Sequence, residues 1–122
     1  MKLLIHTTSE DLFCMANLVP KRTGLSATIF SEHSGIQRNI PHNIPRAKIS
    51  TTDSEVSVSI ESNPKILAGE ESVEGSDRKA IKESIEYVGR NSDLFLRHFE
   101  DIDDSFDDLD LFNALIERGE FR

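Results

Sequence analysis

The sequence contains no tryptophan, one tyrosine and a single cysteine, Cys14. One cysteine cannot close a disulfide within the chain, which excludes a small secreted scaffold held together by disulfides. No apolar run approaches the ~20 residues that a membrane-spanning helix needs, and Met1 to Ile5 is too short for a signal peptide. We therefore expect a protein of the reducing cytoplasm with no membrane segment.

The chain has 122 residues, 37% of them hydrophobic, which is enough for one modest core. We expect a single domain over residues 1–122, in which residues 100–122 form an acidic helical segment. The net charge of −8 is distributed unevenly, because residues 1–48 carry six Lys and Arg against three acids, whereas residues 49–122 carry eight against nineteen. Segregated charge of this kind orients or repels a partner.

Alternation with a period of two predicts strands in the first half of the chain. Residues 55–61 alternate strictly and place Val56, Val58 and Ile60 on one face, with Ser and Glu on the other. A turn at Ser62-Asn63-Pro64 then predicts a hairpin. Further extended segments are expected at residues 2–6, 25–31, 46–50 and 65–68.

Helical spacing dominates the second half. Ser76 is the expected N-cap of a helix that carries Ile81, Ile85 and Val88 on one stripe and is interrupted at Gly89 and Asn91. A second helix is expected from Ser92. A third is expected to begin with a capping box formed by Ser105 and Asp108 and to end at Gly119.

A short helix is also expected over residues 9–19, stopped by Pro20. Strands at the front and helices at the back favour an α+β fold, in which C-terminal helices pack on one face of a small antiparallel sheet.

Residues 34–45 contain Gly35, Pro41 and Pro45, which exclude a regular helix or a central strand and predict an extended loop. Positive charge and histidine accumulate on and just after this loop, a composition typical of an anion or phosphate site. The alternative interpretation of His42 is a loop side chain that hydrogen-bonds the backbone. The candidate anion-binding residues are Arg38, His42, Arg46 and Lys48.

Seven acids lie within the eleven residues from Glu100 to Asp110, where Ile102, Phe106 and Leu109 interrupt them. These acids are interpreted either as a solvated helix edge or as a surface that docks a basic protein or imitates a nucleic-acid backbone. The candidate partner-binding residues are Glu100, Asp101, Asp103, Asp104, Asp107 and Asp108.

Catalytic and cofactor signatures are missing from the sequence. The histidines and Cys14 have no zinc spacing, and the acidic run lacks the glycine and closing glutamate of a calcium loop. A glycine-rich phosphate loop and a serine-centred nucleophile motif are also absent. We expect no metal and no cofactor, and we interpret His98, which neighbours Phe99, as a structural side chain.

Two blocks of the chain resemble a family of short bacterial proteins known as domain of unknown function 4160. The first block comprises residues 16–25, a strand, and Pro41-His42-Asn43-Ile44-Pro45-Arg46-Ala47-Lys48-Ile49; the second comprises residues 56–60, an acidic link and residues 81–99. The resemblance implies a small α+β protein, often encoded beside a second small protein as toxins and antitoxins are. It carries over no catalytic residue.

Charge segregation and the missing catalytic motifs favour a non-catalytic bacterial or mobile-element protein that binds and regulates a partner protein with a basic surface. An antitoxin-like protein, or an inhibitor of a nucleic-acid-directed defence enzyme, is the concrete form expected. Two alternatives stay open: nucleic-acid binding by the basic segment 38–48, and a nuclease or phosphotransfer enzyme that uses His42.

Overall fold

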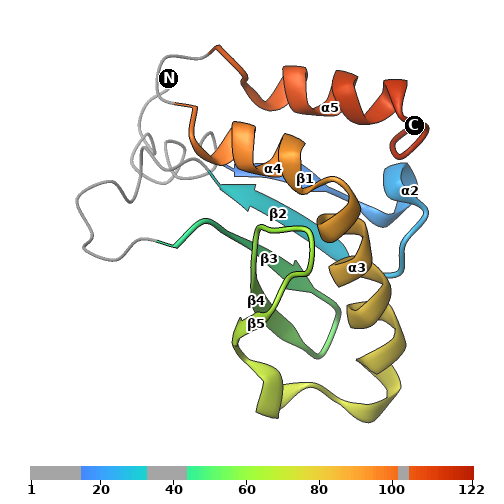
Figure 1. Cartoon of the computed structure of the whole chain (residues 1–122). Coiled ribbons are helices and arrows are strands. Elements are labelled where there is room, and N and C mark those ends of the chain that lie inside the picture. Colours follow the sequence, from blue (N-terminus) through green and yellow to red (C-terminus); the bar gives the residue numbers. More distant parts are fainter. Residues whose placement is uncertain (1–14, 33–43, 102–104) are drawn as a thin grey trace, which may run out of the picture.

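The computed structural model describes residues 15–32, 44–101 and 105–122. Its five strands form one antiparallel sheet in the order β1-β2-β3-β4-β5, so each strand pairs with its neighbour in sequence (Figure 1). The strands are β1 (Met15–Leu18), β2 (Thr28–Glu32), β3 (Arg46–Ser50), β4 (Glu55–Ser59) and β5 (Ile66–Ala68). A short helix, α2 (Pro20–Thr23), connects the first two strands.

The two faces of the sheet differ in composition because side chains alternate along each strand. Leu18, Ile29, Ile49 and Val56 stand in register across four strands, and each is at most 1% exposed. We call this side the inner face. The opposite side, the outer face, carries mainly polar and charged residues. One buried face and one polar face are typical of an antiparallel sheet covered by helices on a single side.

Three helices follow the sheet in the chain: α3 (Arg78–Arg90), α4 (Ser92–Phe99) and α5 (Asp108–Glu117). Figure 1 shows α3 and α4 crossing one face of the sheet, with α5 alongside α4. Their buried side chains, which include Ile81, Val88, Phe95 and Leu111, join the inner-face residues in one core cluster. The expected α+β architecture, a small antiparallel sheet with C-terminal helices on one face, is confirmed.

The helix expected over residues 9–19 is wrong where the structure describes it, because Met15–Leu18 is strand β1. Ala16 and Leu18 are buried while Asn17 is exposed, so burial alternates with a period of two. Pairing with β2 determines the conformation of this segment, which shows tertiary contacts overriding an apparent helical spacing.

Both predicted helix caps are also displaced. Asp77, not Ser76, occupies the N-cap of α3, and its carboxylate accepts hydrogen bonds from the Thr51 and Ser54 hydroxyls instead of capping the helix. The capping box of α5 is formed by Asp107 and Asp110, two residues beyond the predicted pair.

Asn91 ends α3 as its C-cap, as predicted, but Gly89 does not interrupt the helix, which continues to Arg90. A Cβ atom at this position would lie 2.8 Å from the Ser62 carbonyl oxygen and 2.9 Å from Pro64 Cδ. The glycine therefore allows the helix to pack closely against the β4–β5 turn, which explains why a helix-breaking residue is tolerated inside a helix.

The strands expected at residues 46–50, 55–61 and 65–68 are confirmed within one or two residues at their ends. The strand expected at residues 25–31 begins three residues later, at Thr28. The strand expected at residues 2–6 and most of the loop expected at residues 34–45 lie outside the described residues. Within the described part of the chain, no helix is long and apolar enough to cross a bilayer.

Candidate functional site

The exposed side of α5 is an apolar and acidic surface. Leu109 is 64% exposed and Ile116 is 44% exposed, and their spacing of seven residues places them on one side of the helix. Asn113 and Glu117 are also exposed on this side. We call these four residues the outer α5 surface. The helix itself contains no Lys or Arg.

The predicted partner-binding acids differ in their surroundings. Glu100 is exposed, whereas Asp101 is only 4% exposed and accepts hydrogen bonds from the Ser105 hydroxyl and the Phe106 amide at 3.2 and 3.1 Å. Asp107 accepts the Asp110 amide in the capping box, and this hydrogen bond lowers the pKa of Asp107. Asp103 and Asp104 lie outside the described residues. Of the predicted acids that the structure describes, Glu100 is therefore the exposed one, and Glu117 adds an exposed carboxylate at the end of α5.

Asp108 makes a contact that the sequence did not reveal. Its Oδ1 lies 2.7 Å from His98 Nε2, and His98 Nδ1 lies 2.8 Å from the hydroxyl of Ser31. A serine, a histidine and an aspartate thus form a hydrogen-bonded chain across β2, α4 and α5. Ser31 and His98 are both 0% exposed, so the hydroxyl is not presented to a substrate. Full burial and a hydrogen bond at each ring nitrogen are what is expected of a structural histidine.

The sequence held only indirect signals of this chain of contacts. Ser31 lies on the inner face of β2 between Ala16 and Ala47, and His98 falls on the buried side of α4 with Phe95. A polar side chain at a buried position needs a partner. Pattern alone could not say which residues supply it, because Ser31 and His98 are 67 residues apart.

The predicted anion site is only partly described. Arg46 and Lys48 lie two residues apart on the outer face of β3, while Arg38 and His42 lie outside the described residues. Lys48 Nζ is 3.8 Å from Glu55 Oε2, in a pair whose side chains are 37% and 57% exposed. The helices cover the inner face, so the described cations of this site and α5 belong to different layers.

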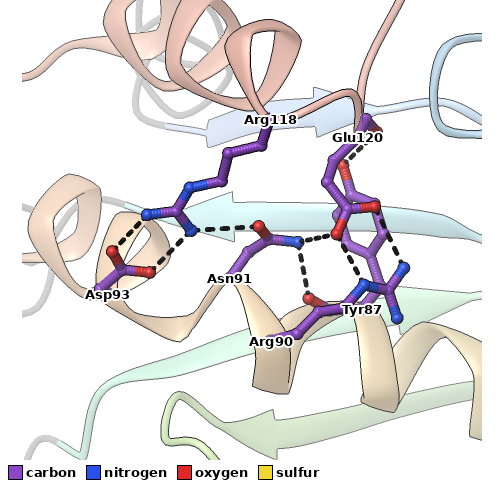
Figure 2. Close-up of polar contacts among 6 residues, drawn as sticks. All are labelled: Tyr87, Arg90, Asn91, Asp93, Arg118 and Glu120. Carbon is purple, nitrogen blue, oxygen red and sulfur yellow. Dashed lines mark hydrogen bonds and ion pairs between the residues drawn. The ribbon is translucent and has the colours of Figure 1, made fainter.

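A second polar cluster holds the C-terminal end of α5 (Figure 2). Buried Asn91 donates to the Tyr87 carbonyl and to Glu120 Oε2 at 3.1 and 3.0 Å, and Arg118 donates to Asn91 Oδ1 at 3.2 Å. The Tyr87 hydroxyl donates to the Glu120 carbonyl at 2.8 Å. Residues from the α3–α4 junction therefore bind the segment that follows α5.

Two guanidinium groups complete this cluster and shift the pKa values of their partners. Arg90 Nε donates to Glu120 Oε2 at 2.6 Å, and this hydrogen bond lowers the pKa of Glu120. Arg118 Nη2 donates to Asp93 Oδ2 at 2.5 Å and lowers the pKa of Asp93 in the same way. Burial raises the pKa of Tyr87.

Among residues 15–32, 44–101 and 105–122, no three His, Cys, Asp or Glu side chains are grouped so that they could hold a metal ion. No family model, curated protein or solved structure matches the chain. The resemblance to domain of unknown function 4160 stays a prediction.

Proposed function

We propose that the protein is a non-catalytic interaction protein that binds and regulates a basic partner protein through the outer α5 surface. The main support is the exposure of Leu109 and Ile116 on a helix that carries acids and no cations. Apolar side chains on one helix stripe, bordered by charge, are typical of a helix that docks in a groove. Glu100 and Glu117 add the negative charge that a basic surface would complement.

The same observation supports binding better than catalysis. Ser31 and His98 have the residue types of a hydrolytic site, but both are fully buried in the contact that fixes α5. An antitoxin-like protein, or an inhibitor of a nucleic-acid-directed enzyme, would need only a stable surface of this kind. Its partner would carry the basic residues with which such an enzyme binds phosphates.

Co-purification from the native host with matched variants tests the proposal. The variant L109S/I116S should lose the partner, because burying each aliphatic side chain contributes about 1.5–3 kcal/mol. Leu67→Ser is the control, since Leu67 is 42% exposed on β5 and lies outside the outer α5 surface. The control should retain the partner.

The recovered partner should be basic, and its affinity should fall as salt is raised, more steeply for the wild type than for E100Q/E117Q. Recovery of the same partner by L109S/I116S at wild-type yield would disprove the use of α5.

A further inference from the structure

Phe30 is an aromatic side chain on the wrong side of the sheet for the core. Of the six Phe residues that the structure describes, four belong to the core cluster and Phe112 packs against it. Phe30 does neither, because it points to the outer face of β2, where Asn17 and Lys48 are its cross-strand neighbours. Packing of the core therefore does not explain this ring.

The ring borders a cavity of about 310 Å³ on the outer face of the sheet. Phe30 and Pro20 supply its apolar wall. The remaining lining is rich in hydroxyl groups and contains no charged residue: Ser26, Thr28, Ser50, Thr51 and Thr52. One aromatic face beside several neutral hydrogen-bonding groups suits a flat, polar ring better than an aliphatic chain.

Two cations extend from this cavity along β3. Arg46, Lys48 and Ser50 share the outer face, and alternate strand residues lie about 6.5 Å apart. Lys48 is directly opposite Phe30 in the register of the two strands. Its pair with Glu55 is exposed and 3.8 Å long, and an exposed pair of this kind contributes little, so a phosphate can replace the carboxylate.

We propose that the outer face binds single-stranded nucleic acid, with one base stacked on Phe30 and a flanking phosphate at Lys48. Aromatic stacking combined with a cationic track is how open sheets hold single strands without reading their sequence. The net charge of −8 keeps the affinity modest. This site lies in a different layer from the outer α5 surface and does not depend on it.

Fluorescence anisotropy with labelled ten-nucleotide oligo(dT) and oligo(rU) tests the proposal at low salt. We expect a dissociation constant below about 1 mM, with a matching duplex weaker because its bases are already stacked. Phe30→Leu should weaken binding about tenfold, whereas Phe30→Tyr should retain it, because only the ring is needed for stacking. Thermal unfolding of both variants verifies that they fold.

Charge variants give effects of opposite sign. Lys48→Gln should weaken binding and reduce the slope of log K against log salt by about 0.7, while Glu55→Gln should strengthen binding. Lys82→Gln on α3 is the control and should leave affinity unchanged. No binding, equal affinity of folded Phe30→Leu and wild type, or equal losses for Lys48→Gln and Lys82→Gln would each overturn the proposal.

Discussion

The two ends of α5 are fastened by contacts of opposite character. At the first residue, Asp108 binds His98, a side chain that is 0% exposed and also contacts Ser31 on the sheet. Beyond the last turn, Arg118 and Glu120 bind a cluster in which Asn91 is buried but Arg90, Asp93 and Arg118 are exposed. One end depends on a buried imidazole, and the other combines one buried amide with charges in water.

This difference predicts unequal consequences of mutation. A buried hydrogen-bonding group that loses its partner bears the full cost of desolvation, whereas an exposed ion pair is replaced by water and salt. The outer α5 surface lies between the two ends, so its presentation depends more on the buried contact than on the visible ion pairs.

His98→Ala gives the largest expected effect. It leaves Ser31 and Asp108 without this partner and opens a cavity among Phe95 and Leu94, which should lower the free energy of unfolding by about 3 kcal/mol. Urea unfolding monitored by circular dichroism measures the loss. Leu96→Ala, at a half-buried site on the same helix, is the control and should cost less. A loss below that of Leu96→Ala would contradict the role given to His98.

Asn91→Ala should have an intermediate effect. Asn91 is 1% exposed and its amide links Tyr87, Glu120 and Arg118, so removing it leaves a buried carbonyl and a carboxylate less satisfied. We expect a loss of about 2 kcal/mol in the free energy of unfolding. Asn91→Asp separates the effect of the amide donor from that of the side-chain shape. It keeps the shape but removes the donor to Glu120, so it should be at least as destabilising as Asn91→Ala. A stable Asn91→Asp would show that the donor does not matter.

Local periodicity predicts the parts of the fold that have one buried face. The alternation of Val56, Val58 and Ile60 and the helical spacing of Ile81, Ile85 and Val88 each match an observed element, since burial on one side imposes the pattern. The apolar pattern of residues 15–18 is too short to distinguish a strand from the predicted helix, and pairing with β2 decides between them. Cap residues were misplaced for a similar reason, as several adjacent Ser and Asp residues compete for each cap.

The candidate surfaces were predictable only in part. The acidic run around α5 is visible in the sequence, but its exposed and buried members are not: Glu100 and Asp101 are adjacent, yet one is exposed and the other is 4% exposed. The position of Phe30 on the outer face follows from its alternation with Ile29, although nothing local says that α3 and α4 pack on the other face. Contacts such as Ser31 to His98 depend on the packing of distant elements and have no local signature.

The exposed ion pair between Arg118 and Asp93 should give the smallest effect. Asp93→Asn removes a pair whose side chains are 39% and 65% exposed, so we expect a loss of about 0.5 kcal/mol that disappears near 1 M salt, where the screening length is about 3 Å.

The pH dependence of the contribution of Asp93 to stability has a definite sign. Because the pKa of Asp93 is lowered in the folded protein, its contribution is present above the ordinary value of about 3.9 and is lost as pH falls through the lowered value. Asp93→Asn should therefore make the loss of stability below about pH 4 less steep, as measured by thermal unfolding at acidic pH, whereas Leu67→Ser should not. If Asp93→Asn left the pH dependence of stability at acidic pH unchanged, the ion pair would contribute nothing to stability. The difference between the two ends of α5 would then come from His98 and Asn91 alone.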